Sequence, residues 1–139
     1  MKITLRRIGD PLHFEAANTQ GNTIEMDAKA ASGGTGKGMG PMETLISALG
    51  GCSCIDIVLF LKKFRQELAD IRVEIEADRD PDHIPSLFVK IHAHYHLYGK
   101  LDARQVEKAI SLSIDKYCSV SQILKKSVPV TYAYTIHSI

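Results

Sequence analysis

The three cysteines are the side chains in this sequence with the clearest capacity for covalent chemistry. Cys52 and Cys54 stand one residue apart in the apolar stretch ALGGCSCIDIVLFL, residues 48–61, and Cys118 follows much later in the chain. The N-terminal stretch lacks the apolar segment typical of a secretory signal, so we expect a cytoplasmic protein. In that reducing compartment an odd number of cysteines argues against structural disulfides, which leaves thiol chemistry or simple burial.

Helix geometry separates the two neighbouring cysteines. Residues two apart on a helix point about 200° away from each other, so Cys52 and Cys54 cannot form a disulfide or bind one metal ion while the helix is intact. Cys54 lies on a second apolar side of the predicted helix, and we expect it to pack as a small hydrophobic group. Cys52 instead has Asp56 one turn further on, on the same side.

Two glycines, Gly50 and Gly51, directly precede Cys52. Glycine inside a helix costs about 1 kcal/mol relative to alanine, so both positions need a reason. That reason is either the close approach of another backbone or room beside the thiol. From this helix alone, packing and thiol chemistry both remain open for Cys52.

Cys118 lies at the junction of two predicted helices, just before the stretch SVSQIL. We expect Ser119 to cap the second helix, with Gln122 at capping-box spacing. A thiol at a helix start lies near unpaired N–H groups and the positive end of the helix dipole, which can stabilise a thiolate. One cysteine in the middle of a helix and one at a helix start are interpreted as an attacking and a resolving thiol.

The glycine-rich loop GGTGKGMG, residues 33–40, invites comparison with phosphate-binding loops. It lacks their spacing, because Ala31 stands where the first glycine is required and Gly38 replaces the magnesium-binding hydroxyl residue. The pattern favours a flexible glycine-rich loop before a helix.

His92, His94 and His96 alternate along one predicted strand and therefore share a face. They could hold a metal ion if acidic or cysteine ligands converged there, but no sequence spacing supplies such ligands. The pattern favours a polar outer face opposite an apolar core face.

The order of predicted elements indicates an α+β fold in one domain, residues 1–139. Strands at 3–7, 12–16 and 23–28 form an antiparallel meander, and a long helix runs from Pro41 to about Leu68, apolar on most of its circumference. Two alternating strands, within 71–77 and 87–97, form a hairpin. A helix follows from Asp102 to near Cys118, then a short helix and a C-terminal edge strand.

The composition excludes some classes of partner. The chain has 139 residues and a formal charge of +1, with acidic and basic residues interspersed. This pattern does not favour nucleic acid or an anionic membrane as a partner. The apolar run is interrupted by Asp56 and ends at Lys62, which favours a buried helix over a membrane span.

The stretches GPMETLISALGGCSCIDIV and DKYCSVSQIL resemble the OsmC/Ohr family of osmotically inducible and organic-hydroperoxide-resistance proteins, and are most similar to its YhfA-like branch. The resemblance covers essentially the whole chain. It implies an intertwined homodimer in which long central helices pack together and place thiol sites at the subunit interface. It further implies that Cys52 attacks an organic hydroperoxide, Cys118 resolves the product and an external dithiol reduces it, with no metal or organic cofactor.

The chain departs from the family's peroxidases in the groups around the thiol. In those proteins a glutamate at the helix start holds an arginine against the thiolate, but no arginine occurs at positions 8–64 here. Arg6, Arg7 or a lysine such as Lys37 are the candidate replacements, and Glu43 is the candidate acid. On a straight helix Glu43 lies about 13 Å along the axis from Cys52 and on the opposite side, so we expect no direct contact.

Two functions therefore follow from the sequence. The first is a thiol-dependent reductase of organic hydroperoxides in oxidative-stress defence, which the two cysteine motifs favour. The alternative is a non-enzymatic dimer that binds a small apolar ligand or senses oxidation, which the missing arginine favours, because a thiol in apolar surroundings without a cation reacts slowly.

Overall fold

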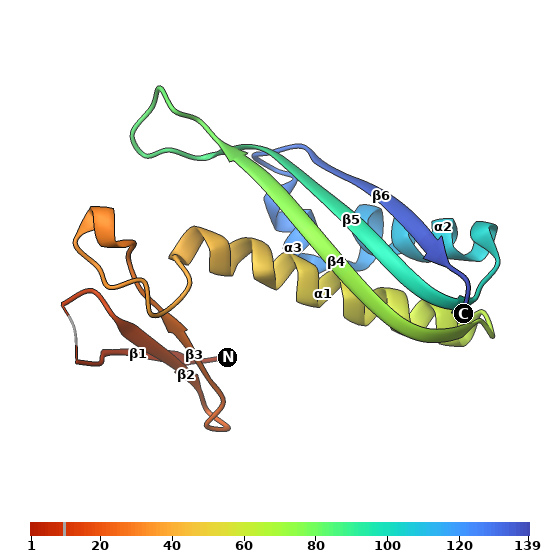
Figure 1. The fold of residues 1–139 in the computed structure, drawn as a ribbon, viewed down its shortest axis with the longest axis horizontal. Helices are drawn as coiled ribbons and strands as arrows, with labels where there is room; N and C mark the ends of the chain where they lie inside the picture. The colour runs from red at the N-terminus through yellow and green to blue at the C-terminus, as the bar shows by residue number, and fades with distance from the viewer. Residues whose placement is uncertain (10) are drawn as a thin grey trace. The chain divides into compact units, whose positions relative to one another are not determined.

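The structure is a computed structural model that describes residues 1–9 and 11–139 (Figure 1). Within these residues three strands, one α-helix, two strands, two α-helices and a last strand follow one another in the order expected, which confirms the α+β class. The chain divides into two compact units, residues 1–45 and 46–139. The assignment of residues 1–139 to one domain stays a prediction.

The N-terminal unit contains the predicted antiparallel meander. Its strands are β1 (Ile3–Arg7), β2 (Phe14–Asn18) and β3 (Thr23–Met26), in the order β1-β2-β3. β2 begins two residues later than expected, because the Ile8 N–H donates to the His13 carbonyl and residues 11–13 stay outside the strand. The alternating apolar residues identified the strands, but the hydrogen bond of the turn sets where β2 begins.

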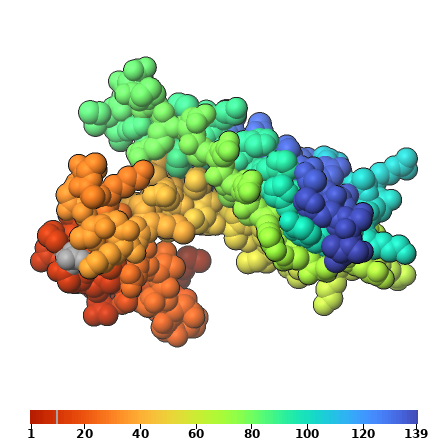
Figure 2. Space-filling view, viewed as in Figure 1, coloured from red at the N-terminus to blue at the C-terminus, as the bar shows by residue number. Residues whose placement is uncertain are grey.

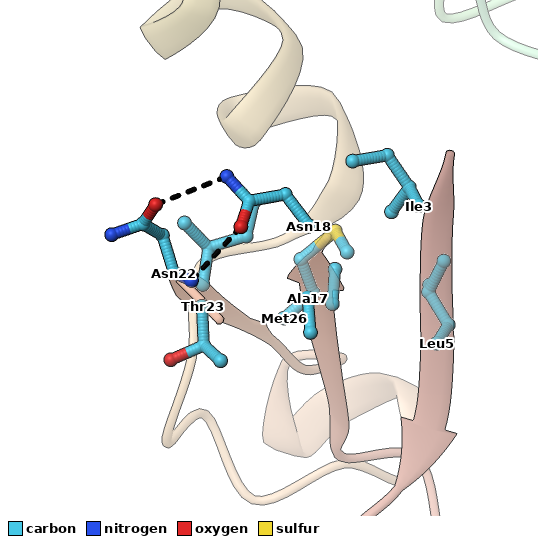
Figure 3. A pocket seen from close by; sticks show the side chains of 9 residues that line it. Ile3, Leu5, Ala17, Asn18, Asn22, Thr23 and Met26 are labelled. Carbon is cyan, nitrogen blue, oxygen red and sulfur yellow. Dashed lines mark hydrogen bonds between the residues drawn. The ribbon is translucent and has the colours of Figure 1, made fainter. Parts of the chain in front are cut away.

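One face of the meander carries an apolar pocket of about 340 Å³. Figure 3 shows Ile3 and Leu5 on β1 beside Ala17 and Met26, with Asn18 and Asn22 hydrogen-bonded at one end. Ile3, Leu5 and Ile24 are each more than half exposed, at 53%, 54% and 52%. Within its own unit this face is therefore not covered.

Asp27 organises the loop that was expected to be flexible. Its side chain is buried and accepts hydrogen bonds from the Thr35 hydroxyl and from the backbone N–H groups of Ala28, Thr35 and Lys37. The Thr35 hydroxyl lowers the pKa of Asp27 below its usual value, against the opposing effect of burial. A β-carbon at Gly34 would meet the Ala28 carbonyl oxygen at 1.9 Å, so the loop closes only around glycine. The flexible-loop interpretation is corrected to an ordered loop.

The long helix α1 (Pro41–Lys63) starts at the predicted proline but ends five residues before the predicted Leu68. The backbone of Arg65 is left-handed, at φ 57°, and the Gln66 N–H donates to the Leu61 carbonyl. This arrangement terminates a helix and reverses the chain. Residues near Leu68 consequently belong to the next strand.

The second unit is built on the sheet β4-β5-β6, comprising β4 (Glu67–Arg79), β5 (Phe88–Lys100) and β6 (Val130–His137). β4 and β5 form the predicted antiparallel hairpin, and β6 pairs in parallel with β5 at the sheet edge. Between β5 and β6 the chain forms α2 (Ala103–Leu112), a π-helical turn (Ser113–Tyr117) and α3 (Ser119–Leu124). Figure 1 shows α2 and α3 on one side of this sheet.

The core of the second unit lies between β5 and the helices. Four of the six positions predicted to face inward in residues 87–97 are fully buried, whereas Leu87, which precedes β5, and Val89 are exposed. The four pack with buried residues of α1, α2 and the π-helical turn: Ile91, Ala93, Tyr95, Leu97, Leu49, Ile57, Leu61, Val106, Ala109, Ile110 and Ile114. The alternating pattern is thus confirmed from Ile91 to Leu97 and wrong at Leu87 and Val89. Packing in this core determines that the side of α1 with Leu49 and Ile57 faces inward.

The three histidines of β5 alternate with its buried residues and so lie on the outer face of the sheet, as predicted. Figure 2 shows the sheet side of the second unit, where β4, β5 and β6 run from green to dark blue. His92 and His94 hydrogen-bond to the hydroxyls of Thr131 and Thr135 at 2.8 Å, and His96 contacts a ring nitrogen of His137 at 3.1 Å. These partners belong to β6. The polar-face interpretation therefore holds, and the histidines link two strands.

The opposite side of α1 is apolar but exposed. Ile55 and Leu59 are 63% and 59% exposed, so the helix is buried on one side only within a single chain. Among the described residues α1 is the one helix long and apolar enough to cross a membrane. Its buried side packs in the protein core, which accounts for part of this apolar composition without a bilayer.

Candidate functional site

The structure brings Cys52, Asp56 and Cys118 together. The two sulfur atoms and a carboxylate oxygen of Asp56 all lie within 4.8 Å of one another. α1 supplies Cys52 and Asp56 from successive turns, and Cys118 comes from the end of the π-helical turn. Two thiols and a carboxylate offer nucleophilic, proton-accepting and metal-binding groups in one place.

Cys54 is not part of this cluster. It is half-buried and packs against the core, as the helix geometry predicted. Burial raises the pKa of the Cys54 thiol to about 11. Its thiol is therefore protonated at neutral pH and serves as a packing group.

Cys118 is the N-cap residue of α3. Its backbone is extended, at φ −69° and ψ 107°, and its sulfur accepts a hydrogen bond from the Ser121 N–H at 3.4 Å. The expectation that Ser119 is the cap is wrong by one residue, because Ser119 is already the first residue of the helix. The Cys118 sulfur itself accepts a hydrogen bond from one of the N–H groups at the start of α3.

Burial dominates the electrostatics of Cys118. The side chain is fully buried, and this burial raises the pKa of the thiol to about 12, assisted by a hydrogen bond with Cys52. The Ser121 N–H acts in the opposite direction but does not outweigh burial. The helix start therefore does not make Cys118 a thiolate, and the half-buried Cys52 is the sulfur that a solute can reach.

Asp56 is oriented by the π-helical turn. Its Oδ2 accepts a hydrogen bond from the Ser113 hydroxyl at 3.2 Å, and that hydroxyl also lies 3.4 Å from the Ser53 carbonyl oxygen. Ser113 is fully buried. Within residues 1–9 and 11–139 no lysine or arginine forms an ion pair with Asp56.

Sequence reasoning missed the hydroxyl groups around the cluster. The Tyr95 hydroxyl donates to Ser53 Oγ at 2.7 Å, and Ser53 in turn donates to the Leu49 carbonyl at 2.8 Å. Burial raises the pKa of Tyr95 well above its usual value. Ser113 could have been identified, since it falls four residues after Ala109 on the apolar side of its helix, where a polar residue needs a buried partner.

The two glycines before Cys52 have different surroundings. A β-carbon at Gly50 would approach Ile75 Cδ1 to 3.1 Å and Val73 Cγ1 to 3.4 Å, so this position is shaped by contact with β4. A β-carbon at Gly51 would meet nothing within 4 Å. Gly50 thus permits close packing, whereas Gly51 faces open space within the single chain.

The remaining predicted residues lie in the N-terminal unit. The Glu43 carboxylate accepts a hydrogen bond from the Gly40 N–H at 3.1 Å, at the start of α1. Arg6 pairs with Glu15 at 3.0 Å across β1 and β2, and Arg7 is exposed at the end of β1. Support of Cys52 by these three residues stays a prediction.

Known proteins similar to this chain were found by sequence and by structure. A family model described as OsmC-like protein matches residues 34–133. Protein YhfA from Escherichia coli strain K12 is 36% identical over 126 residues, which is 90% of each chain. A hypothetical protein from Aquifex aeolicus VF5 has 30% identity and a TM-score of 0.85, over 99% of this chain and 96% of that one. An organic hydroperoxide resistance protein from Elizabethkingia anophelis shares the fold, with 13% identity and a TM-score of 0.73 over 99% and 97% of the chains.

Proposed function

Because this chain belongs to the OsmC-like family, we propose that it is a cytoplasmic, thiol-dependent reductase of organic hydroperoxides. Cys52 is the attacking thiol and Cys118 the resolving thiol. The observation that carries this proposal is the approach of the two sulfur atoms to within 4.8 Å. A hydroperoxide resistance protein with the same fold supports the choice of substrate.

The first step is nucleophilic attack by Cys52 on the hydroperoxide. The sulfur attacks one oxygen of the O–O bond, this bond breaks, and the alkoxide leaves with a proton as the alcohol. The product on the protein is Cys52 sulfenic acid. Asp56, whose carboxylate lies within 4.8 Å of the thiol, accepts the thiol proton. A carboxylate disfavours a neighbouring thiolate, so Asp56 acts as a proton acceptor and not as a stabilising charge.

The second step joins the two sulfur atoms. Cys118 attacks the sulfenic sulfur of Cys52, water leaves, and a disulfide forms. Because Cys118 is buried beside Cys52, its thiol reaches the sulfenic acid ahead of solutes. An external dithiol then reduces the disulfide, so that one hydroperoxide and one dithiol give alcohol, water and a cyclic disulfide.

Apolar residues beside the thiol favour an organic substrate over hydrogen peroxide. Ile55 and Leu59 follow Cys52 at helical spacings of three and seven residues, and both are exposed. An alkyl or aryl hydroperoxide gains contact with such side chains, whereas hydrogen peroxide has no apolar group to bury.

The same apolar side of α1 supports assembly into a homodimer. Ile55, Leu59 and Val58 expose 63%, 59% and 39% of their surface, and Gly51 leaves open space on the helix. A contiguous exposed apolar surface of this kind marks an interaction site, and a second α1 helix has the matching apolar character. We therefore place Cys52 beside the subunit interface.

Leu59→Glu should convert the dimer to a monomer, because the carboxylate would be buried without a partner at the interface. Size-exclusion chromatography with light scattering measures the mass. Lys90→Glu, a charge change at an exposed position of β5 outside α1, should remain dimeric. A monomeric wild type, or a Leu59→Glu variant of dimer mass, contradicts the proposed assembly.

Disulfide mapping tests the peroxidase proposal directly. One equivalent of cumene hydroperoxide added to the reduced protein should join Cys52 to Cys118, detected by peptide mass spectrometry. In Cys118→Ser the oxidised Cys52 should remain as sulfenic acid and react with dimedone, whereas Cys54→Ser should behave as wild type. A disulfide that contains Cys54, or thiols that all survive, would reject the assignment.

The alternative function is a non-enzymatic dimer that binds a small apolar ligand or senses oxidation without turnover. It is favoured because, in the part of the chain described, no lysine or arginine forms an ion pair in the cluster of Cys52, Asp56 and Cys118. A sensor would form the same disulfide but would not consume hydroperoxide repeatedly with dithiothreitol. Steady-state turnover therefore separates the two functions.

A further inference from the structure

Cys52, Asp56 and Cys118 together form a donor set for a metal ion. Their two sulfur atoms and one carboxylate oxygen lie within 4.8 Å of one another. Thiolates bind zinc, whereas magnesium and calcium prefer oxygen ligands. Three protein ligands with an open fourth position are the arrangement of zinc sites that exchange a ligand.

The distances suit a tetrahedral zinc ion. With zinc–sulfur bonds of about 2.3 Å, two sulfur ligands lie about 3.8 Å apart. All three donor atoms already lie within 4.8 Å of one another. Side-chain rotations that move these atoms by about 1 Å therefore bring them to the spacing of zinc ligands. Cys52 and Asp56 stand four residues apart on α1, a spacing that places two ligands on one helix face.

The neighbouring groups hold two of the three ligands in position. Ser113 donates to Asp56 Oδ2, which leaves Oδ1 available, and the Ser121 N–H donates to the sulfur of Cys118. Hydrogen bonds of this kind orient metal ligands and are part of a built site. Ser113 and Cys118 are themselves joined, since the Cys118 N–H donates to the Ser113 carbonyl at 2.8 Å.

We propose that the reduced protein binds one Zn²⁺ per chain through Cys52, Asp56 and Cys118. Binding releases the two thiol protons and involves no electron transfer. Two thiolates and one carboxylate exceed the charge of the ion by one, and the half-buried Cys52 leaves a fourth position for water. While zinc engages both sulfur atoms, no disulfide can form between them. The site does not require the peroxidase chemistry proposed above.

Competition titration tests the site. Reduced wild type, kept under argon, is titrated with Zn²⁺ against a chromophoric chelator, and one tight equivalent per chain is expected. Asp56→Asn should weaken binding by about tenfold or more, and Cys118→Ser should do the same. Cys54→Ser, which changes a cysteine two residues from the site, should bind as wild type does, and excess Mg²⁺ should not compete.

Cobalt provides a second readout that needs no variant. Co²⁺ bound to wild type should show a thiolate-to-cobalt charge-transfer band, and this band should be absent once the protein has been oxidised to the disulfide. No tight equivalent in wild type, equal affinity in Cys118→Ser, or no charge-transfer band would overturn the metal site. If wild type does not turn over hydroperoxide, only the peroxidase proposal is rejected. The metal site is unaffected by that result, because these binding measurements contain no peroxide.

Discussion

Replacing Cys52 with serine should reduce turnover of cumene hydroperoxide by about three orders of magnitude or more, since a serine hydroxyl is a far weaker nucleophile toward the O–O bond than a thiol. Hydroperoxide consumption with dithiothreitol as reductant measures the effect. Serine differs from cysteine by one atom, so the half-buried position keeps its packing. Circular dichroism of the variant should match that of wild type.

Two further cysteine variants are the controls for Cys52→Ser. Cys118→Ser should slow turnover, because dithiothreitol must then reduce the Cys52 sulfenic acid directly. Cys54→Ser should leave the rate unchanged, because the Cys54 thiol packs against the core outside the cluster. Turnover that survives Cys52→Ser, or that falls equally with Cys54→Ser, would show that another group reacts with the hydroperoxide.

Periodicity predicted the inward side of β5 better than it predicted the C-terminal end of α1. The alternation along β5 identified Ile91, Ala93, Tyr95 and Leu97 as core residues because inward and outward positions differ sharply in polarity. It also assigned Leu87 and Val89 to that face, and both are exposed. The end of α1 depends on a left-handed residue, which is Arg65 here and not the usual glycine or asparagine. Apolar periodicity continues past that point, so it extended the predicted helix too far.

The candidate site shows the same division between local and tertiary information. Helix spacing placed Asp56 beside Cys52 and separated Cys54 from both, because those relations are local. The approach of Cys118 depends on the π-helical turn and on its packing against α1 through Ser113, neither of which has a sequence period. The single sequence therefore identified the residues of the cluster but could not show that Cys118 lies close to Cys52 and Asp56.

Cys118 illustrates how tertiary burial can reverse a local electrostatic argument. A helix start favours a thiolate by typically 0.3–1 kcal/mol at exposed sites, roughly less than one pKa unit. Desolvation of a buried group shifts a pKa by up to several units. Burial prevails at Cys118, where it raises the pKa of the thiol to about 12. The helix start therefore gives no reason to prefer Cys118 over the more accessible Cys52 as the attacking thiol of the proposed mechanism.

Ile57→Ala should lower the free energy of unfolding by about 2–5 kcal/mol, because the side chain is fully buried in the core and its removal leaves a cavity. Ile55→Ala removes the same atoms two residues earlier, where the side chain is 63% exposed within one chain. If α1 packs on a second copy, the cost of Ile55→Ala arises from weaker dimerisation and changes with protein concentration. Urea unfolding across a range of concentrations separates the two effects. If Ile55→Ala instead lowers the free energy of unfolding as much as Ile57→Ala does, at every protein concentration, then Ile55 packs in the core of the single chain. That result would contradict the exposed apolar surface proposed for the dimer.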